Sequence, residues 1–381
     1  MQPTRRRPFL PLLLATLTAP ITAQGFTFTP VTTLATTPVR DQARSGTCWC
    51  FATTSFLESE LLRLGKGSVD LSEMFTVRQT YPRKADRYVR MHGQATLGPG
   101  GIAQDMLVAF RDFGAVPESV YSGRLGEQAR HDHDELDAVL KGMLDVIVKK
   151  PGQVLSPRWP LAVAGVLDAY LGAPPATFDH QGREYTPRSF ADSLGIDPTA
   201  YVCFTSFTHQ PFDQQVPIEV PDNWAGHTAW NLPLDELLGV LEQALANGFT
   251  VAWDGDVSER GFREGDGVAV LPKQPWEERS REQRDAFARA PEPELLVTPE
   301  LRQRLFDAYE TTDDHLMHIV GTAHDQEGTL YFTTKNSHGT RGSKAAGYVQ
   351  MSTAYVRAKT VSILLHRDGV PAATGKRLGL R

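Results

Sequence analysis

Cysteine is scarce in this chain of 381 residues, which contains only Cys48, Cys50 and Cys203. Three cysteines are too few for a disulfide scaffold, and an odd number leaves at least one thiol unpaired if the chain is exported. The composition is otherwise that of a globular protein, with 41% hydrophobic and 22% charged residues, which excludes collagen, coiled coils and wholesale disorder. The first question is therefore whether one of the thiols is reactive.

An excess of positive charge is also missing. The chain has 39 Lys and Arg against 45 Asp and Glu, which gives a formal net charge of -6. This balance offers no electrostatic reason to bind nucleic acid or an anionic membrane. The sequence contains no internal repeat and, after the N-terminus, no apolar run long enough for a transmembrane helix.

The N-terminus has the pattern of a secretory signal peptide. Three arginines at positions 5–7 precede the short apolar run 9–19, and small residues follow up to Ala23. We therefore expect residues 1–23 to be removed and the mature chain to be periplasmic or extracellular, without stable membrane association after cleavage. An uncleaved anchor or a frayed N-terminus is the alternative.

Apolar spacing predicts helices in the first two thirds of the chain and strands in the last third. Helices are expected over residues 48–64, 102–113, 136–147, 161–171 and 233–245. Strands are expected over 249–253, 317–323, 329–334, 348–351 and 361–366, with 325–328 as a hairpin turn. Residues 26–37 should be extended, 173–231 loops and short strands, and 276–307 a solvated helical face. A helical part followed by a strand-rich part predicts an α+β protein of two lobes with a cleft between them.

Cys48 is the candidate nucleophile because it begins a predicted buried helix. A thiol is nucleophilic as the thiolate, and the free N–H groups and positive dipole end of a helix N-terminus favour that anion. Cys50 and Cys203 are expected to be core residues, since an unpaired cysteine is usually a small buried hydrophobe.

A cysteine nucleophile needs a histidine partner and a side chain that orients the imidazole ring. His318, on a predicted strand, and Asn336 follow Cys48 in that order, although Asn336 could also serve only to cap a turn. Gln42, six residues before Cys48, could donate an amide N–H to an oxyanion. His315 is expected to be a solvated loop residue, and on a strand it would face away from His318, so no metal site is expected.

These residues resemble the papain-like cysteine peptidases, and within them the bleomycin hydrolase and aminopeptidase C branch. The segment 42–49 is similar to the nucleophile signature of that family, and the resemblance covers essentially the whole mature chain. It implies that Cys48 is the nucleophile, that His318 is the base and that Asn336 orients it. It also implies that Gln42 and the Cys48 N–H bind the oxyanion, and that no cofactor is needed.

The resemblance extends to substrate-binding positions. Gly100 and Gly101 look like the glycine pair whose backbone pairs with the bound substrate, although they could serve only as a turn into a helix. In this branch the C-terminus lies in the cleft, so the resemblance implies that the terminal carboxylate of Arg381 pairs with the amino group of the substrate. One departure is His338, which stands where the family usually has a tryptophan.

The resemblance implies a papain-like two-lobe fold with a helical lobe, an antiparallel barrel-like lobe and a large middle insertion. The expected divisions after the signal peptide are 24–122 for the helical lobe, 123–230 for the insertion and 231–381 for the mainly β lobe with its C-terminal tail. The insertion accounts for the 270 residues between Cys48 and His318.

The predicted activity is hydrolysis of peptides by an aminopeptidase with a Cys-His-Asn thioester mechanism. Two alternatives remain open at this point, a papain-like endopeptidase and a catalytically silent protein that binds peptides. The expected partners are peptide substrates and not nucleic acid. Because members of the branch commonly form hexameric rings, a homo-oligomer is also left open.

Overall fold

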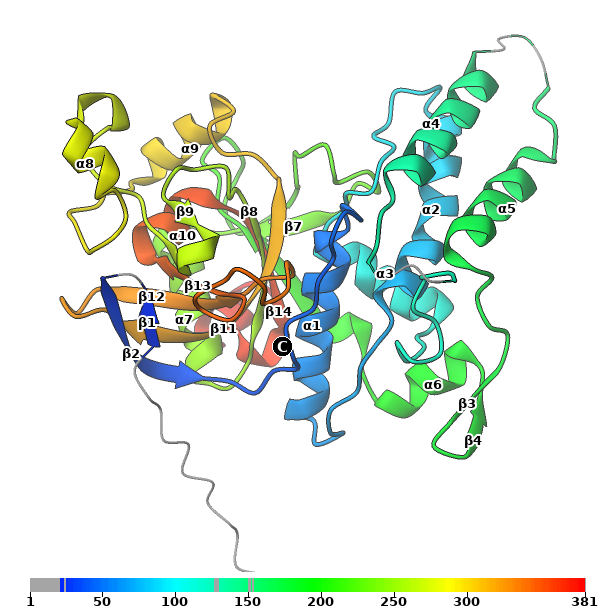
Figure 1. Cartoon of the computed structure of the whole chain (residues 1–381), viewed down its shortest axis with the longest axis horizontal. Coiled ribbons are helices and arrows are strands. Elements are labelled where there is room, and N and C mark those ends of the chain that lie inside the picture. The colour runs from blue at the N-terminus through cyan, green and yellow to red at the C-terminus, as the bar shows by residue number, and fades with distance from the viewer. Residues whose placement is uncertain (1–20, 24, 127–129, 150–151, 153, 381) are drawn as a thin grey trace, which may run out of the picture.

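The computed structural model describes residues 21–23, 25–126, 130–149, 152 and 154–380. Helix α1 (Cys48–Arg63) runs between a group of helices on one side and a large sheet on the other (Figure 1). The predicted α+β arrangement of two lobes is therefore confirmed.

The helical lobe is formed by the first half of the chain. Its other helices are α2 (Glu73–Arg90), α3 (Ala103–Phe113), α4 (Asp134–Val148), α5 (Trp159–Leu171) and α6 (Pro187–Leu194). The predicted helices at α1, α3, α4 and α5 are confirmed within a few residues, whereas α2 and α6 were not predicted. Both have polar sequences and depend on side-chain caps, since Ser72 accepts the Phe75 N–H and Thr186 accepts the Ser189 N–H.

The second lobe is built on a sheet of 12 strands among the described residues. The strands of the sheet are β1 (Ile21–Ala23), β2 (Phe26–Thr33), β5 (Tyr201–Thr205), β6 (Gln215–Pro217), β7 (Thr228–Asn231), β8 (Val251–Gly255), β9 (Phe262–Arg263), β10 (Val268–Ala269), β11 (His315–His324), β12 (Leu330–Lys335), β13 (Tyr348–Ser352) and β14 (Thr360–His366). They run in the order β6-β7-β5-β14-β8-β11-β12-β13-β10-β9, with β2 paired to both β1 and β11. All pairs are antiparallel except β5 with β7 and β10 with β13.

The remaining elements cover this sheet or extend from the helical lobe. They are α7 (Leu234–Ala246), α8 (Arg281–Asp285), α9 (Pro299–Asp307), α10 (Thr353–Lys359), α11 (Ala372–Arg377) and the small hairpin of β3 (Phe178–His180) with β4 (Arg183–Tyr185). The predicted solvated face at 276–307 is wrong for α9. Its Arg302 is 1% exposed and donates to backbone carbonyl oxygens, including that of Ser206 at 2.7 Å.

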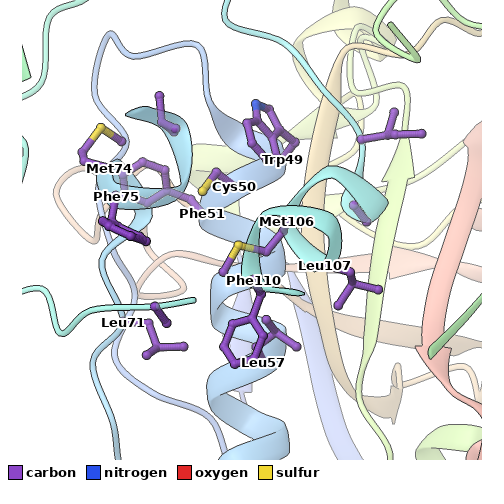
Figure 2. Close-up of a cluster of buried hydrophobic side chains, with 14 of the residues drawn as sticks. Trp49, Cys50, Phe51, Leu57, Leu71, Met74, Phe75, Met106, Leu107 and Phe110 are labelled. Atoms are coloured by element: carbon purple, nitrogen blue, oxygen red, sulfur yellow. The ribbon is translucent and has the colours of Figure 1, made fainter. Parts of the chain in front are cut away.

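Helix α1 is buried on nearly all sides because both lobes pack on it. On the helical side, Trp49, Phe51 and Leu57 of α1 meet Met74 of α2 and Phe110 of α3 in one apolar cluster (Figure 2). Burial of such large side chains contributes about 1.5–3 kcal/mol each. This cluster holds the first turn of α1, and therefore Cys48, in a rigid setting.

The predicted insertion 123–230 does not form one unit. Helices α4 and α5 pack on α2 and enlarge the helical lobe, whereas β5 and β7 lie in the large sheet beside β14. Strands that precede residue 230 thus share one sheet with strands that follow it, and the division expected at this residue stays a prediction. No helix in the described part of the chain is both long enough and apolar enough to span a membrane.

Candidate active site

Two loops that are far apart in the sequence meet at the N-terminus of α1. Asp41 forms an isolated antiparallel bridge with His338, and the Gln42 N–H donates to the Ser337 carbonyl oxygen at 2.8 Å. These contacts join the segment leading into Cys48 to the segment that follows β12. The sequence prediction that Gln42, Cys48 and Asn336 share one site is consistent with this arrangement.

Cys48 is the first residue of α1 and carries a free thiol. Burial raises the pKa of this thiol to about 12, while a hydrogen bond from the Leu316 backbone lowers it. The nearby carboxylates of Asp222, Asp254 and Asp313 raise the pKa further. The helix N-terminus is therefore only one of several influences on the thiol, and it is opposed by burial and by acidic neighbours.

The histidine beside Asn336 is His315, the first residue of β11. Its Nε2 lies 2.7 Å from Asn336 Oδ1, and both side chains are buried. Leu316, whose backbone hydrogen bonds with the Cys48 thiol, is the next residue in the strand. The expectation that His315 is a solvated loop residue is wrong, because the strand begins at this residue and inserts its ring between the lobes.

The predicted contact between His318 and Asn336 is not made. His318 is fully buried, its Nδ1 lies 2.8 Å from Ser55 Oγ on α1, and its ring packs edge-on against Phe56. Burial, with the nearby Lys335 ammonium, lowers the pKa of His318 well below its usual value. His318 is therefore a neutral core histidine that joins β11 to the middle of α1.

The hydrogen bonds of Asn336 determine the tautomer of His315. Asn336 Nδ2 donates to Glu264 Oε1 at 2.7 Å, and Asn336 Oδ1 accepts the Ser337 N–H at 2.7 Å. Because the amide oxygen accepts, the His315 Nε2 must carry the proton. The lone pair of the neutral ring is then on Nδ1, the atom available to take a proton from a thiol.

His338 covers this pair in the place where the family has tryptophan. Its ring centroid lies 4.9 Å from that of His315, with 32° between the ring planes. Its Nδ1 lies 2.9 Å from Glu264 Oε1, so one carboxylate holds both His338 and Asn336. The imidazole thus provides an aromatic cover over the contact between His315 and Asn336.

The pKa of His315 is lowered to about 4, mainly by burial and also by His338. Burial thus favours the neutral form of both Cys48 and His315 when each is considered by itself. A proton that moves from the thiol to the imidazole forms two opposite charges in neighbouring positions, which attract strongly in a buried site.

The side chain of Gln42 is held in one orientation. Its Oε1 accepts the Ser337 hydroxyl at 2.6 Å, and the residue is 6% exposed. The amide NH2 group is consequently the end available to an anion. The Cys48 backbone N–H is a second donor, because the first N–H groups of a helix have no acceptor within the helix.

Gly100 and Gly101 lie opposite the first turn of α1. Trp49 Nε1 donates to the Pro99 carbonyl oxygen at 2.8 Å, and a Cβ atom at Gly101 would lie 3.1 Å from the Trp49 ring. A Cβ atom at Gly100 would overlap the carboxylate of Asp222. Asp222 therefore covers the face of Gly100 at which the sequence analysis expected a substrate backbone.

The C-terminal residue Arg381 lies outside the described residues. The residues just before it, Gly379 and Leu380, line a pocket of about 330 Å³ with Tyr201, Cys203 and Trp230. None of the predicted catalytic residues lines this pocket. The role predicted for the Arg381 carboxylate stays a prediction.

Cys50 and Cys203 are buried as predicted, and Cys50 Sγ lies 3.2 Å from the Glu73 carbonyl oxygen. No group of three or more His, Cys, Asp or Glu side chains that could hold a metal ion occurs among the described residues.

Sequence reasoning missed His315, Glu264 and three acidic residues near the thiol. His315 and His318 are the two histidines of the motif His-Leu-Met-His, and apolar residues follow each of them. The motif therefore does not indicate which histidine meets Asn336. Glu264 is more than 70 residues before Asn336 and carries no local motif. The register of β11 against β12 could have identified His315, but it depends on a bulge that the sequence pattern does not reveal.

The comparisons with known proteins agree with the resemblance seen in the motifs. No protein-family profile matches the chain. An Aminopeptidase C of Lactococcus lactis subsp. cremoris is 22% identical over 373 residues, covering 87% of this chain and 81% of the relative. An Aminopeptidase C of Lactococcus lactis subsp. lactis has the same identity and coverage.

Among solved structures, the fold is similar to that of PepW from Lactobacillus rhamnosis. The TM-score is 0.71 at 19% sequence identity, and the match covers 92% of this chain and 85% of that one. This likeness confirms the papain-like two-lobe fold.

Proposed function

We propose that this chain is a cysteine aminopeptidase that hydrolyses peptides through Cys48, His315 and Asn336. The observation that carries the proposal is the contact of His315 Nε2 with Asn336 Oδ1, beside a free thiol at the N-terminus of a buried helix. The similarity along most of the chain to two proteins named Aminopeptidase C supports peptide substrates and cleavage from the amino terminus.

The reaction follows from the positions of the donors and acceptors. His315 Nδ1 takes the proton of the Cys48 thiol, and the thiolate attacks the scissile carbonyl carbon. The oxyanion is stabilised by the Gln42 amide and the Cys48 N–H. His315 then returns the proton to the leaving amine, which leaves a thioester on Cys48.

Hydrolysis of the thioester uses the same residues. His315 removes a proton from water, the resulting hydroxide attacks the thioester, and the proton passes to the Cys48 sulfur as the amino acid leaves. Asn336 keeps Nδ1 of His315 directed at the reacting atoms throughout. No cofactor takes part in this scheme.

We expect one equivalent of iodoacetamide to alkylate Cys48 and to abolish hydrolysis of aminoacyl amides. Cys50 and Cys203 are buried and should not react in the folded protein, so mass spectrometry of the tryptic peptides assigns the modified thiol. A Cys203→Ala variant is the matched control and should be inactivated in the same way. An enzyme that stays active after complete alkylation of Cys48, or a Cys48 that does not react, would contradict the proposal.

We further propose that the chain is exported and acts outside the cytoplasm, since residues 1–23 have the pattern of a signal peptide. N-terminal sequencing of the mature protein should begin at Gln24, and cell fractionation should find the protein outside the cytoplasm. A mature protein that starts at Met1 and stays in the cytoplasm would contradict export. Light scattering on the same preparation would report whether the chain forms a homo-oligomer.

A further inference from the structure

We propose that Asp222, Asp254 and Asp313, here called the carboxylate trio, bind the α-ammonium group of the peptide that Cys48 cleaves. This inference rests on the proposed function and names the group that restricts it to substrates with a free amino terminus. All three members belong to the sheet lobe, in three separate parts of the sequence, and Asp222 reaches across to Gly100 of the helical lobe.

The pairing of β8 with β11 places Asp254 near the Cys48 thiol. Asp254 lies in β8 directly opposite Leu316 of β11, and opposite residues of an antiparallel pair point to the same face. Leu316 packs into the core of the helical lobe, and its backbone hydrogen bonds with the Cys48 thiol. The Asp254 carboxylate therefore points towards the first turn of α1.

Asp254 and Asp313 each have a buried oxygen that receives no donor except a proton shared between the two carboxyls. Asp254 is 1% exposed, and its Oδ1 accepts no hydrogen bond from a donor group of the described residues. Asp313 Oδ2 is likewise buried without a donor. Ser362 donates to the other Asp254 oxygen at 3.2 Å. The two carboxyls also hydrogen bond with each other, which requires one of them to hold a proton.

Asp222 closes over Gly100. Asp222 is partly buried over this glycine, and the Gly100 carbonyl oxygen already accepts a hydrogen bond from Lys84. A peptide that extended past this point along Gly100 would have to displace Asp222. Asp222 therefore limits the length of substrate before the scissile bond and places a negative charge where its first residue begins.

The chemistry of the trio matches an ammonium group. An α-ammonium has three N–H donors, and carboxylates accept charge-assisted hydrogen bonds from it. Lys84, which is 3% exposed, is the cation near Asp222, and Asp105 is a further acid near it. Asp314 is a further acid near Asp313, and it accepts the Val257 N–H at 2.9 Å. Among the described residues the acids named here outnumber Lys84, and a bound ammonium would offset their charge.

Binding should therefore depend on pH in two ways. Burial raises the pKa of Asp313 to about 7, so this carboxyl gains a proton as the pH falls below about 7 and attracts an ammonium less. Burial also raises the pKa values of Asp222 and Asp254. The α-amino group of the substrate loses its own charge above about pH 8. KM for a free aminoacyl amide should be lowest between these two limits.

The experiment compares leucyl-amidomethylcoumarin with its N-acetylated form in the full-length mature enzyme. Asp222→Asn and Asp313→Asn should each raise KM for the free amine by about 10- to 100-fold. The same variants should not weaken cleavage of the N-acetylated substrate. In Asp313→Asn, the rise of KM for the free amine at low pH should be lost. Asp285→Asn, an exposed carboxylate on α8, is the matched control and should behave as wild type.

Two further measurements separate the possible outcomes. Alkylation of Cys48 by one equivalent of iodoacetamide and an unchanged melting temperature show that a variant is folded with its thiol intact. A chain extended by three glycines moves the terminal carboxylate and should keep the wild-type KM. If that extension raises KM as much as Asp222→Asn does, the amine is held by the C-terminus and the inference fails.

The inference also fails if the variants lose both substrates equally, if neither substrate is affected, or if only substrates beginning with Lys or Arg are affected. In each of these cases the proposed function still holds if Cys48 reacts with iodoacetamide and if this alkylation abolishes hydrolysis. An enzyme that hydrolyses neither substrate and has an inert Cys48 would instead remove the proposed function.

Discussion

Replacing His315 with glutamine should lower kcat/KM for aminoacyl amides by about 10⁴-fold. His315 is the imidazole held by Asn336 at 2.7 Å, and its removal leaves no base for the thiol and no acid for the leaving amine. Steady-state kinetics with leucyl-amidomethylcoumarin measure the loss. Burst kinetics would show whether formation of the thioester is the step that fails.

His318→Gln is the matched control for this variant because it changes the same residue type three positions away. Glutamine can still reach Ser55 on α1, so kcat/KM should stay within about 3-fold of wild type, given that the ring makes no contact with Asn336. A loss of melting temperature is expected, since His318 is fully buried. If His318→Gln abolished hydrolysis in a folded protein while His315→Gln remained active, the assignment of the base would be reversed.

Gln42→Ala should lower kcat by about 10²- to 10³-fold with little change in KM. The Gln42 amide is oriented by the Ser337 hydroxyl. In the proposed mechanism this amide binds the substrate oxygen once that oxygen has become negatively charged. A donor that acts only in the transition state changes kcat and kcat/KM by the same factor.

Ser337→Ala tests whether the orientation of Gln42 matters. It removes the hydroxyl that donates to Gln42 Oε1 but keeps the backbone contact between the two loops, so a smaller loss of kcat is expected. An effect of Gln42→Ala on KM alone would mean that the amide binds the ground-state substrate, and the oxyanion assignment would then be wrong.

The acidic surroundings of Cys48 have a consequence for catalysis. Burial, together with the carboxylate trio, raises the pKa of the thiol, so the free enzyme disfavours the thiolate. An ammonium bound to the trio would offset these charges and lower the pKa of Cys48 at the moment when a substrate is present. Substrates with a blocked amino terminus lack this effect, and it adds to their exclusion by Asp222.

Local patterns were sufficient for the helices that carry an apolar stripe. The spacing of Phe56, Leu57 and Leu61 after Cys48 predicted α1, and a glycine follows the last turn of α3 and of α5 as expected. Helix α2 was missed because its surface is rich in charge and its buried residues are separated by polar ones. Its stability comes from packing against α1 and α5, which a local pattern does not contain.

The acidic residues near the thiol could not be found from sequence spacing. Asp222, Asp254 and Asp313 come from a loop before β7, from β8 and from the segment before β11, and no motif connects them. Only the pairing of β8 with β11, and the closure of the loop over Gly100, bring them to one place.

The cysteines and the order of the motifs were determined by the sequence itself. The chain has three thiols and no excess of positive charge, and its motifs predict one reactive cysteine at a helix start. A histidine and an asparagine far along the chain are its predicted partners. Which histidine meets Asn336 was decided by tertiary structure. Between β11 and β12 the register is regular from His324 to Gly321, and its continuation would place His318 opposite Asn336.

A bulge between Ile319 and Gly321 shifts this register by one residue, so that His318 pairs with Lys335. A shift of one residue turns every following side chain to the other face of the sheet. His318 is thereby turned towards Ser55 of α1, and His315 is the histidine that hydrogen bonds with Asn336.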